Sequence, residues 1–99
     1  MTAITVRHAV SADLSDIARL AALDSASPPR GPALVAEADS RMLAALPLGS
    51  GRPIADPFEP TAEAVALLEL RAEQLREKRE ARRSVGERLR GVFRIPARA

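Results

Sequence analysis

The sequence predicts a small α+β domain: an antiparallel sheet of three to four short strands, one helix packed on it, and a long C-terminal helix. Three observations favour this class. Apolar and polar residues alternate near the start of the chain, a hairpin pattern occupies the middle, and helical spacing dominates from residue 61 onward. With 99 residues, the chain is too short to divide into several cores.

The first predicted elements are a strand and a helix. Residues 4–10 alternate as a half-buried strand does, and His8 shares the face of the apolar residues. Ser11 is typical of an N-cap and begins a predicted helix over residues 12–23. Residues 24–32 contain three Pro and one Gly, which predicts a loop.

The middle of the chain predicts an antiparallel meander. Residues 33–38 and 41–46 are short strand segments joined at Asp39 and Ser40, a pair that tolerates tight turns. Residues 52–56 supply a short fourth strand. We expect the outer edge of that strand to be open.

The last predicted element is a helix from residue 61 to about Arg83. Its apolar stripe comprises Val65, Leu68, Ala72 and Leu75. Beyond Gln74 the helix is mostly charged, so we expect it to project into solvent or along a partner. These patterns predict one domain over residues 1–83 and a basic, weakly helical or disordered tail over residues 84–99.

The composition narrows the chemistry. The chain has no Cys, which excludes disulfides, thiolate metal sites and Cys nucleophiles and favours a cytoplasmic location. It has one His and no Tyr, so it holds few general acids or bases. Its longest uncharged stretch, residues 42–51, is too short to cross a bilayer. We therefore expect a protein without a membrane span and without an obvious catalytic set.

Two segments resemble a known family. Residues 4–20, ITVRHAVSADLSDIARL, and residues 34–45, LVAEADSRMLAA, are similar to the opening strand and helix and to the following hairpin of the GNAT family of N-acetyltransferases. The resemblance covers roughly residues 4–80. It implies the N-terminal half of the acetyltransferase fold.

The cofactor loop of that family is where the resemblance weakens. In the family, the central helix begins with a loop of fixed pattern: Gln or Arg, any two residues, Gly, any residue, then Gly or Ala. Bare backbone N–H groups at this helix start hold the acetyl-CoA pyrophosphate. The aligned positions here include Glu59, Ala62 and Ala64, with Pro60 and Glu63 between them. The two Glu residues add negative charge, Ala62 adds a Cβ where Gly allows close approach, and Pro60 lacks an N–H donor. Each of these features disfavours the binding of a pyrophosphate. The resemblance therefore implies a degenerate relative with no cofactor and no catalytic residue, and acetyl-CoA would bind only if this interpretation is wrong.

Single residues offer little further chemistry. Asp56 lies near the position of the family's general base, but an Asp before Pro is typical of a turn, which we favour. His8 has no second His or Cys to complete a metal site, so we expect a structural or surface role and no metal. Asp13 and Asp16 are typical of a solvated first helical turn.

The basic tail leaves three interpretations open. Val85, Leu89, Val92 and Phe93 would share one helical face. Possible contacts with an anionic surface are Arg82, Arg83, Arg88, Arg90, Phe93 and Arg94. The tail could dock on a membrane surface or an acidic protein, bind nucleic acid, or remain solvated, and we favour the solvated tail.

Together these patterns predict a noncatalytic, acetyltransferase-like interaction module that forms a homodimer or binds another protein. The predicted interface is the stripe of Val65, Leu68, Ala72 and Leu75, because we expect little of the same chain to cover it. One alternative is an acyl-CoA-binding or N-acetyltransferase enzyme completed across a dimer interface. Another is a peripheral membrane or nucleic-acid tether that acts through the basic tail.

Overall fold

The computed structural model describes residues 3–49 and 51–94, with side chains described up to Arg88. The elements in chain order are β1 (Thr5–His8), the 3-10 turn η1 (Ser11–Asp13), α1 (Leu14–Leu23), β2 (Ala33–Ala38), β3 (Arg41–Pro47), β4 (Ile54–Ala55) and α2 (Ala62–Arg94). All four strands form one antiparallel sheet in the order β1-β2-β3-β4. The predicted α+β class, with a short helix and a long C-terminal helix, is confirmed.

The hairpin between β2 and β3 turns at the predicted pair. Asp39 and Ser40 have φ angles of 51° and 64°, so both occupy the left-handed region. Two consecutive residues of this kind match the right-handed twist of the flanking strands. The pairing shifts register between Ala36 and Glu37, which indicates a bulge near the turn.

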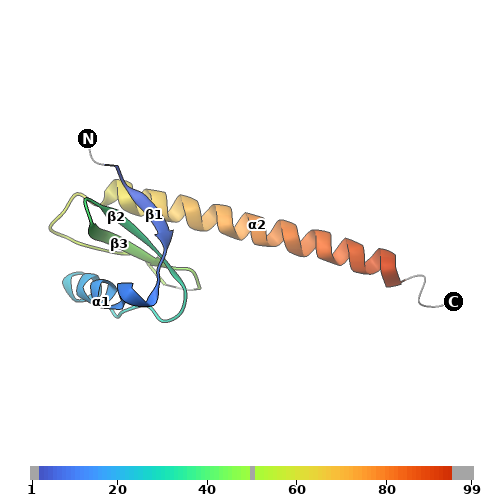
Figure 1. Cartoon of the computed structure of the whole chain (residues 1–99), viewed down its shortest axis with the longest axis horizontal. Coiled ribbons are helices and arrows are strands. Elements are labelled where there is room, and N and C mark those ends of the chain that lie inside the picture. Colours follow the sequence, from blue (N-terminus) through green and yellow to red (C-terminus); the bar gives the residue numbers. More distant parts are fainter. Residues whose placement is uncertain (1–2, 50, 95–99) are drawn as a thin grey trace.

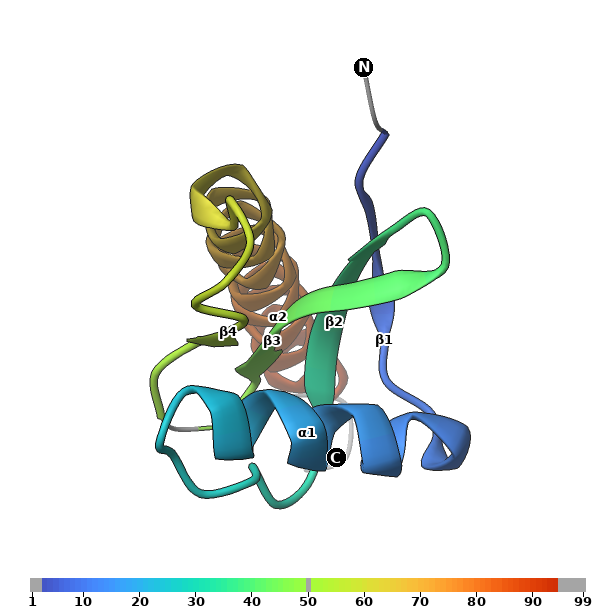
Figure 2. The ribbon, with the colours of Figure 1, turned by 90° about the vertical axis from the view of Figure 1, so that its left-hand side faces the viewer.

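The sheet is covered by a helix on each face (Figure 2). On one face, α1 contributes Ile17, Leu20 and Ala21 to a cluster with Val35, Met42, Ala45 and Ile54. On the other, α2 contributes Ala64, Leu68 and Ala72 to a cluster with Leu34, Ala36, Ala44 and Leu46. Because strand side chains alternate between faces, β2 and β3 supply both clusters. The result is three layers around two thin, Ala-rich cores.

This arrangement corrects the predicted partner interface. Leu68 is 0% exposed and Ala72 is 8% exposed, both against the sheet of the same chain. Val65 and Leu75 are half-buried against the same cluster. The prediction was wrong because it left the second face of the sheet uncovered. That face buries the stripe, so the stripe is core rather than a docking surface.

Helix α2 is longer than the sequence predicts. It continues to Arg94 rather than ending near Arg83, so residues 84–94 of the predicted tail are helical. At 1.5 Å per residue, its 33 residues span about 50 Å. The radius of gyration is 18.1 Å, against about 13 Å for a compact domain of this length. Figure 1 shows the second half of α2 extending well beyond the sheet. We call residues 76–94 the overhang.

Candidate interaction surfaces

The start of α2, where the family resemblance placed the cofactor loop, is an acidic surface. The Oε1 atom of Glu59 lies 3.0 Å from Nη1 of Arg41 on β3, and Glu63 is exposed in the first helical turn. Ala62 is exposed, whereas Ala64 is fully buried against the sheet. These side chains do not line the groove described below, nor the two smaller cavities beside the loop between α1 and β2.

Asp56 serves the turn that precedes α2. It is 4% exposed, and its Oδ1 accepts the N–H of Phe58 at 2.8 Å. Its Oδ2 lies 3.8 Å from Nη1 of Arg19 on α1. These contacts agree with the turn role predicted for Asp56. They also fix the backbone of Phe58, whose side chain is 80% exposed.

The outer edge of β4 is shorter and better covered than the sequence predicts. The strand has two residues, and the N–H of Ala55 donates to Oδ2 of Asp24 at 3.2 Å. A carboxylate that occupies an edge donor blocks strand addition at that position. The open edge expected here is therefore not a strong docking site.

A partly buried ionic cluster was missed by sequence reasoning. Asp13 was interpreted as solvated, yet it is 6% exposed and accepts two hydrogen bonds from Arg7, at 2.8 and 2.9 Å. Arg7 also donates from Nε to Glu37 at 3.0 Å. The N–H of Val10 donates to Asp13 at 2.7 Å. The signal in the sequence was the acidic residue three positions after Val10, which can bond back to that N–H.

These contacts shift the pKa of both partners. The hydrogen bonds from Arg7, followed by the bond from the Val10 N–H, lower the pKa of Asp13 from 3.8 to about 2. The same pairing with Asp13 and Glu37 raises the pKa of Arg7 above its ordinary value. Both groups are therefore charged throughout the neutral range.

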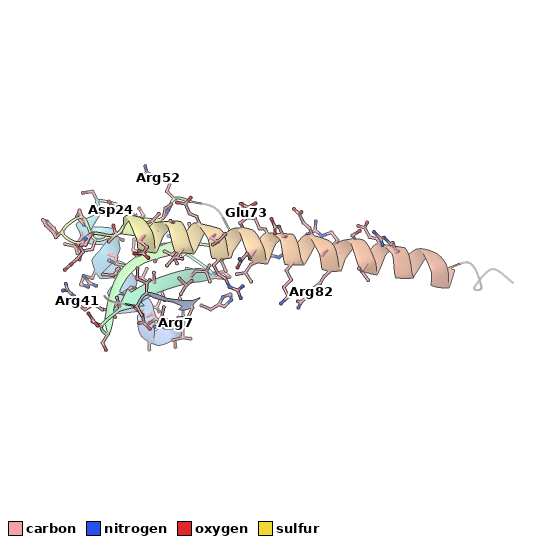
Figure 3. The ribbon with its side chains drawn as sticks, turned by 90° about the horizontal axis from the view of Figure 1, so that it is seen from above. Arg7, Asp24, Arg41, Arg52, Glu73 and Arg82 are labelled. Carbon is pink, nitrogen blue, oxygen red and sulfur yellow. The ribbon has the colours of Figure 1, made fainter. Side chains whose placement is uncertain are left out.

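A groove of about 490 Å³ lies where α2 leaves the sheet. Its sheet side is formed by the end of β1 and the β3–β4 loop, with His8, Leu46, Pro47, Leu48, Gly49, Gly51 and Pro53. Its helix side carries Glu69, Ala72, Glu73, Leu75, Arg76, Lys78, Arg79 and Arg82. The exposed His8 thus has a surface role at the groove. Figure 3 shows Glu73 and Arg82 pointing to opposite sides of α2, so the groove has an acidic flank and a basic flank.

The described side chains of the overhang, up to Arg88, are mostly charged and exposed. Of the residues predicted as possible anionic-surface contacts, Arg82, Arg83 and Arg88 are exposed, and Arg90, Phe93 and Arg94 lie outside the described side chains. The contact itself stays a prediction. The side of α2 that faces away from the sheet also carries two large apolar residues. Leu70 is 55% exposed and Val85 is 51% exposed.

Two further searches concern the described residues only. No helix among residues 3–49 and 51–94 combines the length and the apolar character that a membrane crossing requires. In the same part of the chain, no group of three or more His, Cys, Asp or Glu side chains could hold a metal ion.

Comparisons with protein-family models, with curated proteins and with solved structures find no match. The resemblance to the N-acetyltransferase family therefore stays a prediction from the sequence.

Proposed function

We propose that the chain is a noncatalytic interaction module of acetyltransferase-like architecture, and that it pairs with a second copy of itself through the outer face of α2. The observation that carries this proposal is a line of outward-facing residues on α2 with large apolar side chains at both ends. The line runs through Leu70, Gln74, Glu77, Ala81 and Val85. Steps of three and four residues keep these positions on one side of a helix.

An antiparallel pair of α2 helices would match this line with itself. If the two-fold axis passes between Glu77 and Lys78, Leu70 of one copy lies opposite Val85 of the partner subunit. Gln74 then faces Ala81 of the partner subunit. Because the contact is isologous, it covers the exposed Leu70 and Val85 of both copies.

The charge distribution along α2 supports the same orientation. Residues 62–75 contain three Glu and one Arg, whereas residues 76–94 contain seven Arg and one Lys against three Glu. Antiparallel pairing places the acidic half of each helix beside the basic half of the other. Complementary charge favours such an encounter and disfavours the parallel one.

The start of α2 supports the noncatalytic part of the proposal. Glu63 places negative charge where an acyl-CoA pyrophosphate would approach the helix, Glu59 is held in an ion pair with Arg41, and Pro60 offers no N–H. No Tyr is available as a general acid. Calorimetry with acetyl-CoA tests this directly. We expect no heat of binding, and micromolar affinity would favour an enzyme instead.

Sedimentation equilibrium tests the pairing. We expect a dimer at micromolar concentration, which becomes a monomer in the Leu70→Glu, Val85→Glu double variant because a charge is then buried in the contact. The matched control is Val10→Glu with Leu14→Glu. These two residues are 58% and 65% exposed near the start of α1, and the same change there leaves the dimer intact. A wild-type monomer at about 100 µM would overturn the pairing.

The overhang suggests one competing function, a tether to nucleic acid or an anionic membrane. Its exposed Arg82, Arg83 and Arg88 are the supporting observation. The Arg82→Ala, Arg83→Ala, Arg88→Ala variant separates the two proposals, because it removes the supporting charges and keeps Leu70 and Val85. The tether predicts that binding to duplex DNA or anionic liposomes is lost, whereas the pairing proposal predicts weak, salt-sensitive binding in both proteins.

A further inference from the structure

We propose that the groove beneath the base of the overhang binds a short acidic segment of another protein, one that carries a single large apolar side chain. This surface lies on the sheet-facing side of α2. It is therefore separate from the outer face proposed for self-association, and binding there does not depend on dimer formation.

The floor of the groove supplies an apolar contact. Leu46 and Leu48 lie on either side of Pro47, the last residue of β3, and Leu75 lines the same groove from α2. Leu48 and Leu75 are only half-buried. The volume of about 490 Å³ lies within the range of about 300–1,000 Å³ common for ligand sites. The floor can therefore cover one side chain of the size of Leu or Phe.

The basic flank supplies unsatisfied charge. Leu68, Ala72 and Leu75 form the sheet-facing stripe of α2, and helical spacing continues this stripe into Arg79 and Arg82. The stripe thus changes from apolar to basic where the sheet ends. Among the described residues, no carboxylate forms an ion pair with either Arg79 or Arg82.

The acidic flank favours an acidic peptide over nucleic acid as the ligand. Glu69 and Glu73 line the opposite side, and Glu73 lies 3.6 Å from Arg76. A polyanion such as nucleic acid would meet these carboxylates as it crosses the groove, and the described lining has no Phe, Tyr or Trp on which a base could stack. A peptide can direct its acidic side chains to one flank only. Its backbone N–H groups can face the other.

The test is a fluorescence anisotropy titration with a labelled peptide of Asp and Glu residues around one Leu. The protein is the monomeric Leu70→Glu, Val85→Glu variant, so the outcome does not depend on self-association. We expect saturable binding in the micromolar range that weakens with salt. Replacing the peptide Leu by Ala is expected to weaken binding about tenfold, because the apolar contact is lost.

Two charge-matched variants locate the site. Arg79→Glu with Arg82→Glu is expected to weaken peptide binding at least about tenfold. Arg83→Glu with Arg88→Glu changes the net charge equally but lies off the groove, so binding stays within about twofold. Circular dichroism checks that both proteins keep their helix content. Absence of binding at about 1 mM peptide, equal losses in the two variants, or tighter binding of single-stranded DNA than of the peptide would overturn the proposal.

Discussion

At the scale of single residues, Arg7 joins three separate parts of the chain. It lies on β1 and contacts Asp13 in η1 and Glu37 on β2. Strand alternation predicts the face on which Arg7 lies, but it does not predict that the chain folds back to bring Asp13 beneath it. That return depends on the path of residues 9–12. For this reason Asp13 and Asp16 looked alike in the sequence, although only Asp16 is exposed.

This cluster predicts a dependence of stability on pH. The pKa of Asp13 is about 2 in the folded state and 3.8 ordinarily, so the unfolded chain takes up the proton first as the pH falls. The contribution of Asp13 is therefore complete above about pH 4 and disappears as the pH falls through 2.

Urea denaturation of the Asp13→Asn variant between pH 2 and 6 measures that contribution. Since Arg7 is partly exposed and solvent screens the pair, we expect a loss of about 1–2 kcal/mol at pH 6 that has largely disappeared at pH 2. Asp16→Asn is the control, because Asp16 is exposed and its ion pair with Arg19 is long, at 3.9 Å, and therefore weak. Equal pH profiles for wild type and Asp13→Asn would contradict the assignment.

At the scale of elements, the sequences of β2 and β3 already indicated that both faces of the sheet are covered. Residues 33–36 and 44–46 are continuous apolar runs and are buried throughout. Such runs are typical of strands covered on both faces. They indicated a second helix on the sheet, and α2 is the long helix of the described residues. The predicted end of α2 failed for another reason, because Gly86 costs only about 1 kcal/mol within an otherwise good helix.

The two sides of α2 are therefore expected to respond differently to truncation. Leu68→Ala removes a fully buried side chain and should lower the free energy of unfolding by about 3 kcal/mol at any protein concentration. Leu70→Ala, on the exposed side, should change the unfolding of the monomer by less than about 0.5 kcal/mol. Chemical denaturation at two protein concentrations measures both values. Similar losses in the two variants would mean that the sheet-facing side of α2 is assigned wrongly.

At the scale of the whole molecule, the general architecture was predictable and the surfaces were not. The α+β class, the Asp39–Ser40 hairpin and a projecting helix all follow from local patterns of a few residues. The groove depends on where α2 crosses the end of the sheet, which places His8 and Arg82 around one groove although they are far apart in the chain. Sequence spacing within one element cannot supply such a contact between elements. The same limit applied to Leu68 and Ala72. Helical periodicity placed them on one apolar stripe, but it did not indicate that the sheet covers this stripe.

The length of α2 also governs the rotational diffusion of the molecule in solution. The chain measures 65 × 29 × 21 Å, and α2 lies along the longest dimension (Figure 1). An elongated body spins readily about its long axis and tumbles slowly end over end. Backbone N–H bonds of a helix point along the helix axis, so the fast spinning leaves their direction unchanged. The amides of α2 therefore sense only the slow tumbling, while N–H bonds that lie across this axis sense both rotations.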